Sequence, residues 1–191
     1  MNKSPLFFKT SLMTSAVVLV VISCAIYSPF LQNLFIWDDD TNLTKNPYLK
    51  DVDGLKQIWF DLSAMYQYYP LHFTSFWVEH KIWALEPFGY HLNNVIIHCI
   101  NALILWRILF FLEVRGSWLA AMIFAIHPVQ IESVAWITER KNTLSGFFFF
   151  SSIYFFLKFY NPYKPLNFYK GQSVERSWTI YGISLFLFLC A

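Results

Sequence analysis

The sequence predicts an all-α integral membrane protein with about five transmembrane helices. Its 191 residues are 57% hydrophobic and 21% aromatic, and the mean hydropathy is +0.42. A soluble domain of this size does not need so much apolar surface. Apolar segments that approach the roughly 20 residues needed to cross a bilayer also recur along the chain. The net charge is only +2, which argues against nucleic acid as a partner.

Five apolar segments are the candidate spans. The third is short and is expected to continue toward Ala135. The first is bracketed by Lys3 and Lys9 with no small-residue cleavage site after it, so we interpret it as a retained anchor, with a cleaved signal peptide as the alternative. The candidate spans are residues 8–30, 92–112, 118–128, 143–160 and 178–191.

The three cysteines all lie in apolar segments. Cys24, Cys99 and Cys190 are therefore expected to be buried small hydrophobic residues, and not disulfide or metal ligands.

The distribution of charge predicts the orientation of the five spans. Threading them places the N-terminus, the 107–117 turn and the 158–177 loop on one side, and the acidic segments 38–86 and 132–141 on the other. The positive-inside rule assigns the first side to the cytoplasm and the acidic loops to the periplasm, cell exterior or lumen. The cations of the first side are Lys3, Lys9, Arg107, Arg115, Lys158, Lys164, Lys170 and Arg176, against Glu113 and Glu175.

The chain ends inside an apolar run, residues 186–191, with no charged anchor after it. A span that ends in this way is unusual. We therefore expect the chain to be the N-terminal part of a larger protein, or a truncated gene product.

The first outer loop, residues 31–91, is rich in Trp and Tyr. Asn46-Pro47 marks a turn. Apolar residues recur at helical spacing over 55–62 and again over 73–83, and Pro70 is placed to open the second helix. We expect two short amphipathic helices lying in the membrane interface. A small packed cap without membrane contact is the alternative.

Three consecutive acids, Asp38, Asp39 and Asp40, follow Trp37 at the start of this loop. On an extended segment they cannot all point the same way, so one or two would face a site. Mutual repulsion would raise the pKa of at least one, which suits a general base. The alternative is a solvated turn or helix cap.

Polar residues form a stripe along the second span. His91, Asn94 and His98 fall on one helical face, and Asn101 continues it. Polar side chains within a span are costly and usually face the bundle interior or a cavity. Hydrogen bonding between helices is the alternative role. His91 and His98 are too few for a metal site without further ligands.

The second outer loop, residues 127–142, carries a short ionisable stretch. Pro128, after His127, would end or kink the third span. Glu132 and Glu139 are seven positions apart, and Arg140 and Lys141 add paired cations at the membrane edge. Such a pair suits a lipid phosphate or pyrophosphate, whereas snorkelling anchors are the simpler alternative.

Several blocks, in this order and spacing, resemble the membrane portion of a family. It comprises the C-type, multi-spanning glycosyltransferases linked to tetratricopeptide repeats, the transmembrane O-mannosyltransferase-like group. The blocks are Trp37-Asp38-Asp39, Asn46-Pro47, Tyr69-Pro70-Leu71, Gly89-Tyr90-His91-Leu92-Asn93-Asn94-Val95 with His98, and Phe124-Ala125-Ile126-His127-Pro128-Val129 with Glu132, Val134-Ala135 and Arg140.

This resemblance implies that residues 1–191 are the N-terminal part of a polytopic glycosyltransferase membrane domain. Such enzymes transfer a sugar from a polyprenyl-phosphate carrier in the membrane to an acceptor hydroxyl, of a protein or glycan, on the non-cytoplasmic face, usually with inversion. By position, Asp38 or Asp39 would be the base, with Asp40 ranked third. Arg140 would bind the carrier phosphate with Lys141, and His127 and Glu132 would organise the second outer loop. His91 and Asn94 complete the set of candidate residues for binding the substrate or the carrier phosphate.

Two departures from the family pattern stand out. The family has many more spans followed by repeats, and some members carry a basic residue where Tyr69 stands, so mannose is not assumed as the sugar.

Two other functions are weighed against the transferase. A transporter or flippase for a lipid-linked substrate would line its path with His91, Asn94 and His98, although inverted repeats and broken midplane helices are not visible in the sequence. A non-catalytic membrane scaffold is the other. A divalent cation could bind Asp38 and Asp39, but no spacing demands a metal.

Overall fold

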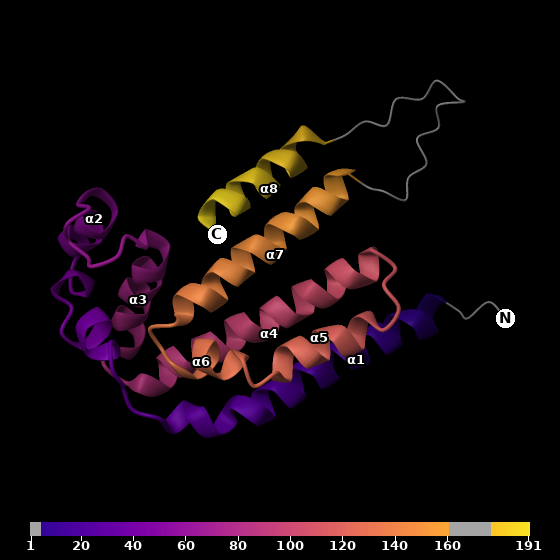
Figure 1. Cartoon of the computed structure of the whole chain (residues 1–191), viewed down its shortest axis with the longest axis horizontal. Helices are drawn as coiled ribbons and strands as arrows, with labels where there is room; N and C mark the ends of the chain where they lie inside the picture. The colour runs from indigo at the N-terminus through magenta and orange to yellow at the C-terminus, as the bar shows by residue number, and fades with distance from the viewer. Residues whose placement is uncertain (1–4, 161–176) are drawn as a thin grey trace.

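The computed structural model describes residues 5–160 and 177–191 (Figure 1), and within them every regular element is a helix. The all-α prediction is confirmed. Lys3, Lys164, Lys170, Glu175 and Arg176, which entered the charge argument, lie outside the described residues. In chain order the elements are α1 (Pro5–Tyr27), η1 (Ser28–Gln32), η2 (Asp40–Thr44), η3 (Pro47–Leu49), α2 (Val52–Phe60), α3 (Pro70–Trp83), α4 (Pro87–Phe111), α5 (Ser117–Ile126), α6 (Gln130–Ala135), α7 (Arg140–Tyr160) and α8 (Trp178–Cys190).

Helices occupy all five predicted spans, but they differ in length. By length and composition, three are able to cross a membrane: Leu12–Gln32, Pro87–Phe111 and Arg140–Tyr160. Ser117–Ile126 and Trp178–Cys190 are apolar but shorter. The ten residues of α5 cover about 15 Å at 1.5 Å per residue, against a hydrocarbon core of about 30 Å. The chain is therefore a membrane protein with three full-length spans and two shorter apolar helices in the described residues.

The third predicted span is broken where the sequence indicates it. His127 leaves the helical region with φ −65° and ψ 132°, the extended conformation that a following proline favours. α6 resumes at Gln130 and ends at Ala135. The continuation toward Ala135 is thus a separate short helix, and Pro128 ends α5 as predicted.

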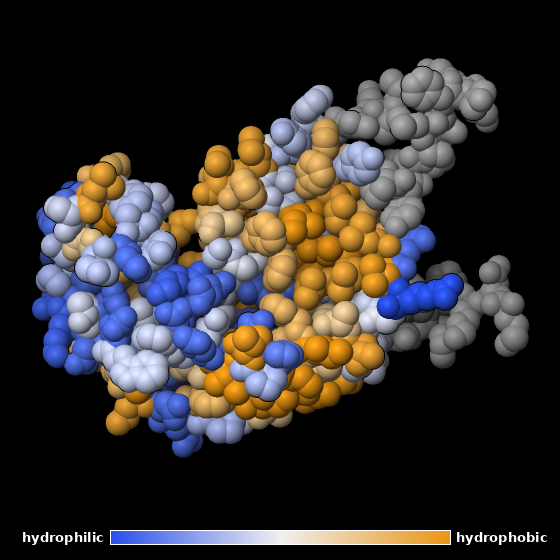
Figure 2. Space-filling model, viewed as in Figure 1, coloured by the Kyte–Doolittle hydropathy of each residue, from blue (hydrophilic) through white to orange (hydrophobic). Residues whose placement is uncertain are grey.

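The apolar helices pack side by side, and the chain runs back and forth between two ends of the bundle (Figure 1). Small residues allow close approach of α4 and α5: Ala102, Ala121 and Ala125 are all fully buried. Leu19 of α1 completes this contact. The outer face of α1 exposes Val17 and other large apolar residues. Figure 2 shows hydrophobic colour over the helices of the bundle, as expected for a surface that faces lipid. The end of the molecule that carries α2 and α3 is mostly hydrophilic in colour.

The cysteine expectation needs one correction. All three cysteines are free, and Cys99 is buried, but Cys24 is exposed and Cys190 is half-buried. Cys24 lies in α1, between the exposed Ile22 and Ile26. An apolar segment predicts burial against lipid as readily as burial in protein, so the residue type alone could not distinguish them.

Residues 33–86, between η1 and α4, form a compact structure at one end of the bundle, which we call the cap. Both predicted helices exist, as α2 and α3, and Pro70 occupies the first turn of α3 as expected. The Asn46-Pro47 turn is also confirmed, because Asn46 caps η3. The cap has its own apolar core. That core contains Leu43, Leu49, Ile58, Phe73 and Phe76, with Tyr90 and Ile137 from outside the cap. The position of α2 and α3 in the membrane interface stays a prediction.

Candidate functional site

The three consecutive acids point in different directions. Asp39 is fully buried. Its Oδ2 accepts a hydrogen bond from the Ile36 backbone N–H at 3.0 Å. Its Oδ1 accepts from the Thr138 backbone N–H at 2.9 Å and from the Thr138 hydroxyl. Asp39 therefore ties the first outer loop to the second, and both of its carboxylate oxygens are already in use.

Asp40 is exposed and paired locally. Its carboxylate accepts from Lys45 Nζ at 2.7 Å and from the Thr44 hydroxyl at 3.2 Å. These hydrogen bonds, that from Lys45 first, lower the pKa of Asp40. The shift is opposite to the one that repulsion within the acidic run predicts, and Asp40 behaves as a solvated surface acid.

Asp38 is exposed and lines a cavity of about 270 Å³ at the junction of the cap and α7. Its carbonyl accepts from the Asn42 backbone N–H at 2.9 Å, which fixes its backbone. Thr138, the partner of Asp39, and Lys141 line the same cavity. Because Asp39 binds Thr138, its hydrogen bonds keep Asp38 and Lys141 at the same cavity.

A second cavity, of about 470 Å³, adjoins the first. The two share Tyr69, His72 and Lys141 as lining residues. Beyond them the second cavity is bordered by Leu144 of α7 and Leu189 of α8. One cavity therefore offers a carboxylate, the other offers apolar helix faces, and a cation stands where they meet.

Lys141 is the accessible cation of the second outer loop. Its Nζ lies 2.8 Å from Glu139 Oε1, and its side chain is 29% exposed. An anion that enters either cavity would meet this ammonium group, in competition with Glu139.

Arg140, beside it, is fully buried and faces the other way. Its guanidinium pairs with the carboxylate of Glu79 in α3. It also donates to Asn94 Oδ1 at 2.7 Å and to the Tyr90 carbonyl at 2.8 Å, and it lies 4.7 Å from the centre of the Phe76 ring. In this arrangement Arg140 joins α7 to α3 and α4 and is not accessible to a ligand.

Two ionisable groups of α3 lie next to Arg140. Burial raises the pKa of Glu79, and the Arg140 charge and hydrogen bonds from Arg140 and Asn93 oppose this shift. Burial, with the nearby charges of Arg140 and Lys141, lowers the pKa of His72 to about 3. His72 is therefore neutral at pH 7 where it lines both cavities.

The polar stripe of α4 binds backbone carbonyls of neighbouring segments. The pairs are His91 Nε2 with Asn33 O at 3.1 Å, Asn94 Nδ2 with Trp136 O at 3.2 Å, His98 Nε2 with Ala125 O at 2.9 Å, and Asn101 Nδ2 with Thr143 O at 2.7 Å. All four side chains are buried. His98 and Asn101 bond to carbonyls of α5 and α7, which is the helix-to-helix hydrogen bonding noted as the alternative from the sequence. His91 and Asn94 bond instead to carbonyls of the segments that follow η1 and α6. His91 and Asn94 thus position the segments that lie next to the site.

His127 and Glu132 are exposed and lie outside both cavities. His127 Nδ1 accepts from the Val129 backbone N–H at 3.2 Å, which stabilises the turn before α6. Glu132 lies in the first turn of α6, where an acid is favourable. In this structure the two residues act only on adjacent parts of the second outer loop, the turn before α6 and the first turn of α6.

Sequence reasoning missed Glu79, Thr138 and His72. Glu79 gave a usable signal, because it lies three positions after Phe76 on the same face of α3, and an acid that is buried with such a face needs a cation partner. Thr138 gave none, since its role depends on a contact 99 positions away. Across residues 5–160 and 177–191, no three His, Cys, Asp or Glu side chains come together as a metal site.

The chain is similar to several curated proteins. It is 28% identical over 181 residues to "Protein O-mannosyl-transferase TMTC3" of Mus musculus, covering 90% of this chain and 18% of that protein. It is 30% identical over 150 residues to "Protein O-mannosyl-transferase TMTC1" of Mus musculus, covering 71% and 16%. With "Protein O-mannosyl-transferase F38B6.6" of Caenorhabditis elegans it shares 29% over 160 residues, covering 74% and 23%.

The chain belongs to the TMTC-like family. The resemblance predicted from the sequence blocks is thereby confirmed. The chain spans about a fifth of the length of these TMTC-like relatives. No protein-family model matches the sequence, and no solved structure matches the fold.

Proposed function

We propose that this chain carries the catalytic outer loops of a glycosyltransferase, which moves a sugar from a polyprenyl-phosphate carrier to an acceptor hydroxyl. The relatives are named protein O-mannosyl-transferases, which supports transfer to a protein acceptor. In this proposal, residues 1–191 form the N-terminal part of a polytopic membrane domain, and residues 31–91 and 127–142 build the site.

The observation that carries the proposal is the pair of adjoining cavities. Asp38 lines the smaller one, Lys141 lines both, and apolar residues of α7 and α8 border the larger one. A polyprenyl phosphate has a lipid chain, a phosphate and a sugar in that order. The larger cavity suits the first isoprene units, Lys141 the phosphate, and the smaller cavity the sugar and the acceptor.

Asp38 is the proposed general base. Its carboxylate takes the proton of the acceptor hydroxyl as that oxygen attacks the anomeric carbon of the sugar. The bond from that carbon to the phosphate oxygen breaks, and polyprenyl phosphate leaves with the electron pair. Attack opposite the leaving group inverts the anomeric centre. Asp39 has both carboxylate oxygens occupied and acts as a positioning residue.

Lys141 is the proposed phosphate ligand. An ammonium group stabilises the negative charge that grows on the leaving phosphate. Arg140, which the sequence assigned first to this role, is enclosed by Glu79, Asn94 and Tyr90. In the proposal Arg140 holds the start of α7 in place so that Lys141 faces the cavities.

The proposed orientation places the cap on the non-cytoplasmic side. The cap and the α6–α7 linker gather at one end of the bundle, and the α4–α5 turn lies at the other (Figure 1). Arg107, Arg115 and Lys158 lie toward the second end, which the positive-inside rule assigns to the cytoplasm. The acceptor would therefore be lumenal, periplasmic or extracellular.

A transfer assay tests the base assignment. Membranes that contain the chain are incubated with radiolabelled polyprenyl-phosphate sugars, and label in protein is counted. The Asp38→Asn variant should lose about 100-fold or more of the rate. The Asp40→Asn variant is the matched control, because it removes an exposed carboxylate two positions away. Transfer by Asp38→Asn at the wild-type rate, or none by wild-type membranes from any donor, would contradict the proposal.

The transporter alternative loses its main support in this structure. It required His91, Asn94 and His98 to line a path, but each of these side chains bonds to a carbonyl of an adjacent segment. The scaffold alternative predicts no sugar transfer and is decided by the assay above.

A further inference from the structure

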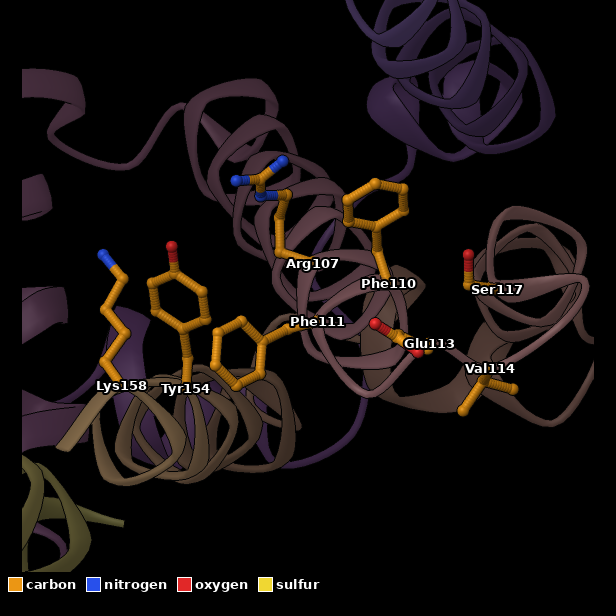
Figure 3. Close-up of a pocket in the computed structure, with 8 residues that line it drawn as sticks. All are labelled: Arg107, Phe110, Phe111, Glu113, Val114, Ser117, Tyr154 and Lys158. Carbon is orange, nitrogen blue, oxygen red and sulfur yellow. The ribbon is translucent and has the colours of Figure 1, made fainter. Parts of the chain in front are cut away.

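A third cavity lies at the opposite end of the bundle from the cap. Its volume is about 670 Å³, and it is formed where the end of α4, the start of α5 and the last turns of α7 meet. Figure 3 shows Arg107, Tyr154 and Lys158 projecting on one side of it and Glu113 on the other. The proposed transferase chemistry uses none of these residues.

Two cations and a phenol converge in this cavity. The ammonium of Lys158 lies 4.6 Å from the centre of the Tyr154 ring. Arg107 also interacts with the Tyr154 hydroxyl, so that one phenol lies within reach of both charges. Within residues 5–160 and 177–191, no carboxylate forms an ion pair with Arg107 or Lys158. Their charge is therefore available to a ligand.

The rest of the lining is largely apolar. Phe110 and Phe111 of α4 border the cavity, and Arg107 lies 6.0 Å from the centre of the Phe110 ring. Ser117, the first residue of α5, also lines it, and a helix N-terminus adds a partial positive charge. Among the described residues that line the cavity, Glu113 is the one acid.

We infer that this cavity binds the phosphate of an anionic phospholipid headgroup. Arg107 and Lys158 contact the phosphate oxygens, the Tyr154 hydroxyl donates to them, and the phenylalanines receive the first carbons of the acyl chains. Basic pockets between helices at the membrane surface are suited to this chemistry. A free phosphate would use the cations but would gain nothing from the aromatic wall, so we assign the site to lipid.

Simple snorkelling would place the same two cations near the membrane surface. Snorkelling predicts side chains that extend toward water, independently of each other. Here Arg107 and Lys158 come from different helices, interact with the same tyrosine and line the same cavity. The convergence of three polar groups is what distinguishes a site from two anchors.

Native mass spectrometry of the detergent-solubilised chain tests the inference. The purified protein is mixed with phosphatidylglycerol or with phosphatidylcholine, and the bound lipids are counted. We expect one phosphatidylglycerol adduct that phosphatidylcholine does not replace. Arg107→Gln and Lys158→Gln should each weaken it about fivefold, the effect of about 1 kcal/mol for one cation near a surface. Tyr154→Phe should weaken it about two- to fivefold, as loss of one hydrogen bond does.

Arg115→Gln is the matched control, because Arg115 is a cation on the turn between α4 and α5 and does not line the cavity. It should leave the adduct unchanged. Equal loss in Arg115→Gln, or equal binding of phosphatidylcholine, would overturn the site. Displacement of the lipid by millimolar inorganic phosphate would overturn the lipid assignment. The two glutamine variants could fail to fold, and Tyr154→Phe then decides the test because it keeps the aromatic ring and both cations. Lipid binding by Tyr154→Phe at the wild-type level would count against the inference.

Discussion

Asp39 and Thr138 lie 99 positions apart, and the carboxylate of the first accepts hydrogen bonds from the backbone N–H and the hydroxyl of the second. Asp39 also accepts from Ile36 N–H. One buried carboxylate therefore fixes the start of the cap against the linker between α6 and α7. This link sets the position of Asp38 relative to Lys141, and with it the geometry of the proposed site.

The Asp39→Asn substitution should destabilise the protein, whereas Asp38→Asn should not. An amide replaces one acceptor oxygen by a donor, so Ile36 or Thr138 loses its partner in a buried place. The expected loss is about 1–3 kcal/mol. Thermal unfolding in detergent, followed by tryptophan fluorescence, measures it. A wild-type midpoint for Asp39→Asn would show that the link is dispensable.

Removing one partner of the Arg140–Glu79 pair should be more damaging. Both side chains are buried, so Arg140→Gln leaves an uncompensated carboxylate, at a cost of about 3–5 kcal/mol. Arg140→Lys should also destabilise the protein, because one ammonium group cannot reach Glu79, Asn94 and the Tyr90 carbonyl together. Chemical unfolding of the solubilised chain gives the free energies.

The double variant Glu79→Gln/Arg140→Gln separates charge from shape. It removes both charges, so its loss should be smaller than the sum of the two single losses. Lys141→Gln, the adjacent position, is the control and should keep wild-type stability. Additive losses in the double variant would argue that the pair does not interact.

The sequence predicted the helices well because their signals are local. Pro70 opens α3, Asn46 caps η3 and Pro128 ends α5, and each depends on a few adjacent residues. The sequence also placed the acidic run and the Arg140-Lys141 pair in the two loops that meet.

The choice among neighbouring candidates could not be predicted in the same way. Asp38 and Asp39 are equivalent in sequence, and only a contact with Thr138 buries one and exposes the other. Arg140 and Lys141 differ in the same manner, because α7 begins at this point and consecutive residues of an α-helix point about 100° apart. In both pairs, long-range packing determines which residue is buried and which is exposed, and no local sequence pattern encodes that packing.

Stability of the cap should fall between pH 7.5 and pH 5 because of His72. Its pKa is lowered to about 3 from the ordinary 6.5, so the folded state resists protonation that the unfolded state accepts. The contribution is complete above pH 6.5 and is lost as the pH falls toward 3. At pH 5 the loss is about 2 kcal/mol, from 1.5 pH units at 1.36 kcal/mol each.

Unfolding midpoints of wild type and His72→Phe at the two pH values test this expectation. The phenylalanine ring fits a site that already contacts Phe73 and Phe76, and it cannot be protonated. The variant should therefore lose most of the pH dependence, whereas His127→Gln, at an exposed histidine, should retain it. An unchanged pH dependence in His72→Phe would assign the effect to another group.

Gly54→Ala should destabilise the cap although alanine is the better helix former. Asp51 caps α2 by accepting from the Gly54 N–H at 2.7 Å, and a Cβ at Gly54 would lie 2.7 Å from the Tyr48 Cα. Because the obstacle is backbone, α2 must move away from η3, at a cost of about 1–3 kcal/mol. Gly182→Ala in α8 is the matched control, since nothing lies within 4 Å of its Cβ, and it should gain up to about 1 kcal/mol from helix propensity. Unfolding midpoints that rise in both variants would mean that the close contact between α2 and η3 does not constrain the cap.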